Sequence, residues 1–106
     1  MIKIAVLVSG SGSNLQALID AKLSGQIVGV LSNRPDAYAL ERAKQAGIKT
    51  ALVEHKQYPS REAFDDVMHQ QLLDWGVNLV VLAGFMRILS EKFVKAWKGK
   101  MLNIHP

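Results

Sequence analysis

Apolar and polar residues alternate along this chain in two different periods that follow one another in strict order. Short runs rich in Val, Ile and Leu are separated by stretches in which apolar residues recur every three or four positions. The runs are typical of buried strands, and the stretches are typical of helices with one apolar face. Strands that alternate with helices predict βαβ units. We therefore expect an α/β fold, specifically a Rossmann-like, open, mostly parallel sheet with helices on both faces.

The same pattern places the individual elements. Five strands are expected at residues 2–8, 27–31, 50–53, 79–83 and 101–104. Four helices are expected between them, with these inward-facing residues: Leu15, Leu18, Ile19 and Leu23; Ala39, Leu40 and Ala43; Phe64, Val67, Met68, Leu72 and Trp75; and Phe93, Val94 and Trp97. The expected caps at the helix starts are Asp36, Ser60 and Ser90, and the expected glycine stops are Gly25, Gly47, Gly76 and Gly99.

Composition and charge narrow the class of protein. The chain has 106 residues, of which 49% are hydrophobic and 21% charged, and no internal run suggests a linker, so residues 1–106 are expected to form a single domain. No apolar run approaches the roughly 20 residues that a membrane span needs. Cysteine is absent, which favours a cytoplasmic location. The net charge of +4 is scattered and lacks an aromatic partner cluster, so we expect neither a nucleic-acid nor a membrane partner.

The first predicted strand leads into a turn of small residues, Ser9-Gly10-Ser11-Gly12-Ser13-Asn14. Small residues let an anion approach the backbone closely, and the start of the next helix offers free N–H groups. A phosphate held by Gly12, Ser13 and Asn14 is the functional interpretation. A plain tight turn with no ligand is the structural alternative.

A dinucleotide site is the main rival for this turn. Its Gly-x-Gly opening is shared with the dinucleotide fingerprint, but Leu15 stands where the third glycine belongs. The second strand is followed by Ser32-Asn33-Arg34 and lacks the acidic residue that binds a ribose hydroxyl. NAD is therefore disfavoured, whereas NADP stays open because Arg34 would suit a 2′-phosphate.

A second candidate lies at the carboxyl end of the fifth predicted strand, in Asn103-Ile104-His105-Pro106. Side chains alternate along a strand, so Asn103 and His105 should project to one side while Ile104 points into the core. An amide donor suits an oxyanion, and an imidazole transfers protons near neutral pH. An ordinary surface histidine is the alternative, and His55 and His69 are both expected to be of that kind.

A third candidate follows the fourth predicted strand, in the apolar segment Ala83-Gly84-Phe85-Met86-Arg87-Ile88-Leu89. Core packing would explain its composition. The segment also leaves the carboxyl end of its strand, where open parallel sheets form their ligand-binding crevice. This position suits a flat heterocycle held by backbone hydrogen bonds between apolar walls.

These three segments in this order resemble the phosphoribosylglycinamide formyltransferase family over the whole length of the chain. The similar stretches are residues 8–16, 60–63, 81–89 and 102–106. The related formyltransferases that act on methionyl-tRNA share the Asn-x-His pattern but lack the glycine-serine turn.

The resemblance implies formyl transfer from 10-formyltetrahydrofolate to the amine of glycinamide ribonucleotide, a step of purine biosynthesis. It implies that Gly12, Ser13 and Asn14 bind the substrate phosphate and that Asn103 and His105 are catalytic. The folate co-substrate would contact the following residues: Arg61, Met86, Arg87, Ile88, Leu89 and Asn103. No metal is implied.

Members of that family are about twice as long, so the chain resembles its amino-terminal half. The resemblance places a catalytic aspartate in the other half. We expect a truncated chain, inactive alone, whose carboxyl-terminal half is a possible partner as a separate chain. Two further classes stay open from the residues themselves: an NADP-dependent oxidoreductase domain and a phosphate-binding module without catalysis.

Overall fold

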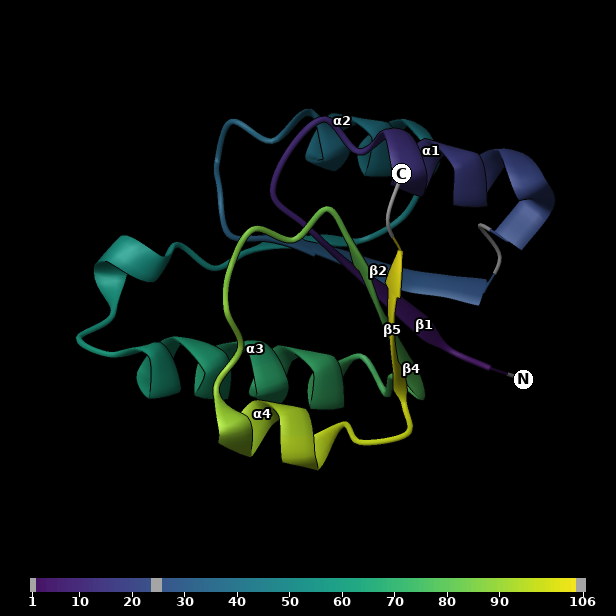
Figure 1. Cartoon of the computed structure of the whole chain (residues 1–106). Coiled ribbons are helices and arrows are strands. Elements are labelled where there is room, and N and C mark those ends of the chain that lie inside the picture. Colours follow the sequence, from purple (N-terminus) through teal and green to yellow (C-terminus); the bar gives the residue numbers. More distant parts are fainter. Residues whose placement is uncertain (1, 24–25, 105–106) are drawn as a thin grey trace.

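The computed structural model describes residues 2–23 and 26–104 and contains a single five-stranded parallel sheet (Figure 1). The strand order is β3-β2-β1-β4-β5. The strands are β1 (Ile4–Val8), β2 (Ile27–Ser32), β3 (Thr50–Leu52), β4 (Leu79–Ala83) and β5 (Met101–Ile104). The helices are α1 (Ser13–Leu18), the π-helical η1 (Ile19–Leu23), α2 (Tyr38–Gln45), the 3-10 helix η3 (His55–Gln57), α3 (Arg61–Asp74) and α4 (Glu91–Ala96).

Helices cover both faces of the sheet, as the sequence predicts. Figure 1 shows α1 and α2 on one face and α3 and α4 on the other. A hydrophobic core lies on each face of the sheet, and alternate residues of β1 contribute to the two cores. Val6 belongs to the same core as Leu15 of α1, and Leu7 belongs to the same core as Phe64 of α3. The predicted α/β fold is confirmed. No helix within the described ranges has the length and apolar character that crossing a membrane requires.

Gly29 of β2 lies at an irregularity in the register with β1 and directly against the ring of Trp75. Ile4 pairs with Ile27, but Ala5 pairs with Gly29, so one residue of β2 is extra at this point. A Cβ on Gly29 would lie 2.4 Å from the ring of Trp75. The glycine therefore lets the end of α3 lie directly against the sheet.

Several predicted details are wrong. The first strand begins at Ile4, not Ile2, while the second extends to Ser32 and the third ends at Leu52, one residue short of Val53. The first helix is α-helical only to Leu18 and continues as η1, in which Lys22 adopts a left-handed conformation (φ 65°). The side chain of Leu23 and the predicted stop at Gly25 lie outside the described residues.

The predicted cap at Asp36 is also wrong. The N-cap of α2 is Ala37, and Asp36 instead accepts two hydrogen bonds from Arg34, each 3.2 Å long. Val67 and Val94, predicted to face inward, are 37% and 42% exposed. Both occupy the edge of an otherwise buried helical stripe, where the period alone does not fix the orientation. Ser60 and Ser90 cap α3 and α4 as predicted.

Candidate functional site

The order in which the chain adds strands to the sheet reverses between β1 and β4. The three candidate segments all lie at the carboxyl ends of the strands. The chain passes from β1 to β2 on one side, whereas β4 lies on the other side of β1. Open parallel sheets bind ligands outside the carboxyl ends of the strands at such a switch point. The turn at residues 9–14 follows β1, the segment at residues 84–89 follows β4, and Asn103 lies near the end of β5.

The turn after β1 has a fixed shape that depends on Gly12. This residue is the N-cap of α1 and has a left-handed backbone (φ 80°, ψ 26°). A Cβ there would lie 2.5 Å from the Cβ of Ala39 and 2.7 Å from its Cα. Ser13 is exposed and Asn14 is half-buried at the start of α1. Of the three residues predicted to bind phosphate, Gly12 is thus buried against α2, whereas Ser13 and Asn14 are accessible at the start of α1.

Ser9 joins the ends of three strands and was not predicted to have a role. Its hydroxyl is buried, donates a 2.6 Å hydrogen bond to Asn33 Oδ1 and accepts a 2.7 Å bond from the backbone N–H of Met86. Ser9 follows β1, Asn33 follows β2 and Met86 lies in the segment after β4. The contact thus fixes the two candidate ligand-binding segments relative to each other. Small polar residues directly after adjacent strands were the available signal in the sequence.

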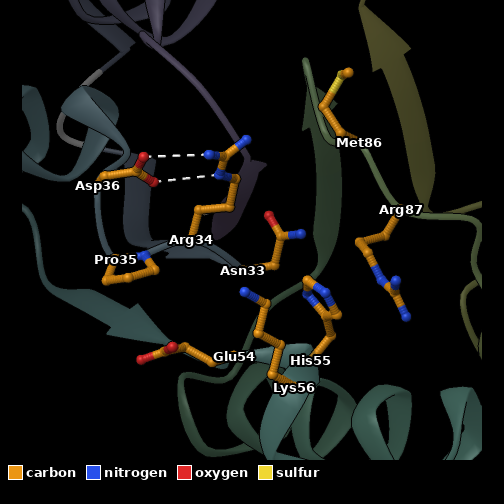
Figure 2. Close-up of a pocket in the computed structure, with 9 residues that line it drawn as sticks. All are labelled: Asn33, Arg34, Pro35, Asp36, Glu54, His55, Lys56, Met86 and Arg87. Atoms are coloured by element: carbon orange, nitrogen blue, oxygen red, sulfur yellow. Dashed lines mark hydrogen bonds and ion pairs between the residues drawn. The ribbon is translucent and has the colours of Figure 1, made fainter.

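A cleft of about 630 Å³ lies beside this contact (Figure 2). Its lining residues are Asn33, Arg34, Pro35, Asp36, Glu54, His55, Lys56, Met86 and Arg87. Met86 and Arg87, which are adjacent in sequence, both line this cleft. Among the other residues predicted to bind folate, Arg61, Ile88, Leu89 and Asn103 do not line it.

Two polar groups at the cleft are buried without partners. The guanidinium of Arg87 lies 5.2 Å from the ring centre of Phe64, and its Nε has no hydrogen-bond partner among the described residues. The same is true of His55 Nδ1. Buried polar atoms lose free energy unless they are hydrogen-bonded. A ligand with acceptor groups would satisfy the Arg87 donor.

The prediction that His55 and His69 are ordinary surface residues is wrong. Both are half-buried. His55 packs edge-on against Phe64 with ring centres 6.4 Å apart. His69 Nδ1 accepts a 3.0 Å hydrogen bond from Trp97 Nε1, which links α3 to the end of α4. Single polar residues on an amphipathic helix do not reveal such a partner in sequence.

The remaining predicted residues are dispersed around the crevice. Arg61 is exposed at the first position of α3, Ile88 is 72% exposed, and Leu89 packs against the core of α3 and α4. Asn103 is exposed and pairs in register with Leu82. Ile104 packs against the opposite core, as the alternation predicts. His105 lies outside the described residues.

The fold and these segments define an α/β domain that presents a glycine-serine turn at its switch point and a cleft between the loops that follow β2, β3 and β4. A family model described as formyl transferase matches residues 2–106. The chain belongs to the formyl transferase family.

Individual relatives are similar over nearly all of the chain. The phosphoribosylglycinamide formyltransferase of Escherichia coli (strain K12) is 50% identical over 99% of this chain and 51% of its own length. The trifunctional purine biosynthetic protein adenosine-3 of Chironomus tentans is 52% identical over 98% of this chain and 8% of its own. The chain therefore spans about half the length of such bacterial relatives and a small part of the trifunctional proteins.

Solved structures agree with the sequence comparison. Glycinamide ribonucleotide transformylase 1 from Symbiobacterium toebii has a TM-score of 0.93 and 45% identity, over 100% of this chain and 52% of its own. Phosphoribosylglycinamide formyltransferase from Coxiella burnetii, in complex with CHES, has a TM-score of 0.94 and 46% identity, over 99% and 51%. These likenesses do not favour an NADP-dependent oxidoreductase.

Proposed function

We propose that this chain forms part of a phosphoribosylglycinamide formyltransferase, which transfers the formyl group of 10-formyltetrahydrofolate to the amine of glycinamide ribonucleotide in purine biosynthesis. The observation that carries the proposal is the position of the two loops named by the family resemblance. The turn at residues 9–14 and the segment at residues 84–89 lie at one edge of the sheet and are joined through the Ser9 hydroxyl. Below, "the full-length enzyme" means a protein that contains this chain and has the length of its bacterial relatives.

Gly12, Ser13 and Asn14 would bind the phosphate of the ribonucleotide. The left-handed Gly12 lets the turn lie directly against Ala39 of α2 and start α1, so that backbone N–H groups are offered to an anion. The N–H groups at the start of α1 are free of intrahelical partners, as in any helix, and favour negative charge.

The segment after β4 suits the folate. Met86 and Ile88 are 79% and 72% exposed, which offers apolar contact to a flat ring. The unpartnered Nε of Arg87 is a donor of the kind that a carboxylate of the folate tail would satisfy. Arg61, Leu89 and Asn103 complete the set that the resemblance proposes. Arg61 would act from the exposed start of α3.

The chemistry proposed for Asn103 and His105 is acyl transfer through a tetrahedral intermediate. The substrate amine attacks the formyl carbon, a C–N bond forms, and the carbonyl oxygen becomes an oxyanion. The Asn103 amide and a protonated His105 would stabilise that oxyanion. The bond from the formyl carbon to the folate nitrogen then breaks as that nitrogen gains a proton, while the attacking amine loses one.

Calorimetric titration of the full-length enzyme with glycinamide ribonucleotide and, separately, with NADPH tests the proposal. The ribonucleotide should bind, and NADPH should not bind measurably. Tighter binding of NADPH would overturn the proposed function and favour an oxidoreductase domain. If the ribonucleotide binds but a separate transfer assay detects no formyl transfer, a phosphate-binding module would be favoured instead.

A further inference from the structure

A single arginine from the neighbouring helix holds the turn at residues 9–14 from behind. Arg42 lies on α2, and its Nε donates a 2.7 Å hydrogen bond to the carbonyl oxygen of Ser11. Its Nη1 donates a 3.2 Å bond to Gln16 Oε1 in α1. One planar guanidinium thus bonds both to the turn and to the helix that follows it.

The stem and the head of Arg42 are themselves held in place. The Cδ would lie 3.3 Å from a Cβ on Gly12, so the stem passes directly over this glycine. The guanidinium lies 5.0 Å from the ring centre of Tyr38, one turn earlier on α2. The backbone N–H of Ala39 also donates to the Gly10 carbonyl oxygen, at 3.2 Å. The middle of the turn, from Gly10 to Gly12, is therefore packed against α2.

We propose that Arg42 is a positioning residue that keeps the turn in its anion-binding shape and adds a fixed positive charge behind it. The proposal rests on the proposed function, because it presumes that the turn binds the ribonucleotide phosphate. The hydrogen bond from Arg42 to the Ser11 carbonyl oxygen matters here. Without it, the peptide group is free to rotate so that this oxygen faces the bound anion and repels it. Lysine cannot reproduce the fork that reaches both partners.

The test compares Arg42→Met, Arg42→Lys and the control Lys44→Met in the full-length enzyme. Arg42→Met keeps an apolar stem but removes the donors and the charge. It should raise the dissociation constant of glycinamide ribonucleotide about 10- to 100-fold, the range expected for lost charged hydrogen bonds. Arg42→Lys should fall between Arg42→Met and the unchanged protein. Lys44→Met removes the same charge from an exposed position of α2 and should bind normally.

Two further readouts separate positioning from mere stability. Glycinamide riboside, which lacks the phosphate, should bind the Arg42→Met variant and the unchanged enzyme equally, and the Michaelis constant for the folate should not change. Equal losses for ribonucleotide, riboside and folate would overturn the inference, as would normal ribonucleotide binding by Arg42→Met. If the unchanged enzyme binds the ribonucleotide no better than the riboside, the phosphate site in the proposed function is itself wrong.

Discussion

Gly10 and Gly12 lie in the same turn, but only Gly12 has no room for a side chain. Nothing lies within 4 Å of a Cβ built on Gly10, whereas one on Gly12 meets Ala39 at 2.5 Å. From the sequence alone, a larger residue at Gly12 is expected to crowd the phosphate and to spare the folate. In the structure the added carbon points at α2 instead of at the phosphate, so a larger residue would disturb the packing of the turn.

Gly12→Ala should therefore lower the free energy of unfolding as well as ribonucleotide affinity. A left-handed backbone costs a residue with a side chain about 1–2 kcal/mol, and the contact with Ala39 adds to this cost. Gly10→Ala is the matched control and should be close to neutral. Denaturant unfolding of both variants measures the difference. Equal stability of the two variants would contradict the geometry assigned to the turn.

His105→Ala tests the proposed proton transfer. In the full-length enzyme this change should reduce turnover by roughly 100- to 10,000-fold, the usual contribution of a positioned acid or base. Both ligands should still bind nearly as before. Steady-state kinetics with each substrate varied in turn distinguish the two effects. A main effect on the Michaelis constants would assign His105 to binding rather than to catalysis.

At the scale of elements, the start of α4 depends on a buried carboxylate from α3. Asp65 is 2% exposed, and its Oδ2 accepts a 2.5 Å hydrogen bond from the backbone N–H of Ser90. Ser90 in turn caps α4 through a 3.2 Å bond from the N–H of Phe93. The end of the segment after β4 is therefore fastened to α3.

Asp65→Ala should destabilise the fold by about 1–3 kcal/mol, because it leaves the Ser90 N–H buried without a partner. Asp66→Ala is the control: this neighbour is exposed and forms only a 3.4 Å ion pair with Lys92, so its removal should cost less than about 1 kcal/mol. Thermal unfolding of both variants provides the comparison. If Asp66→Ala proved the more harmful, the role assigned to Asp65 would be wrong.

Elements were predictable from sequence where one periodic signal was sufficient. The five strands follow from the apolar runs. The glycines predicted to end helices, Gly47, Gly76 and Gly99, all have the positive φ angles that glycine tolerates. Partners distant in sequence gave no such signal. Asp65 reads as an ordinary helical carboxylate, and its bond to Ser90 arises only when α3 and α4 pack together. For the same reason Ser9 and Asn33 were not predicted to meet.

At the scale of the whole molecule, the face covered by α1 and α2 carries an open apolar groove near the sheet edge. Its volume is about 150 Å³, and its lining residues are Ile4, Leu18, Ile27, Leu79, Val81, Leu102 and Ile104. Leu102 is 56% exposed on β5. We propose that the rest of the family's length packs here and supplies the aspartate that the resemblance implies.

The isolated 106-residue chain should accordingly show a broad thermal transition and no formyl transfer. Exposed apolar surface forgoes about 25 cal/mol per Å² of stabilisation, so covering the groove should favour the folded state. Mixing the chain with a polypeptide that corresponds to the rest of the bacterial relatives' length should sharpen the transition and restore activity. Circular dichroism and a transfer assay on each piece and on the mixture test this. A sharp transition with turnover from the isolated chain would refute it.

The most direct test of the central claim is a formyl-transfer assay with the purified full-length enzyme. Glycinamide ribonucleotide and 10-formyltetrahydrofolate carrying an isotopically labelled formyl group are the only reactants, and the label is followed by mass spectrometry. The account predicts that the label moves to the amine of the ribonucleotide in step with tetrahydrofolate release, and that His105→Ala nearly abolishes this transfer. Label that remains on the folate, under conditions where both substrates are bound, would contradict the account.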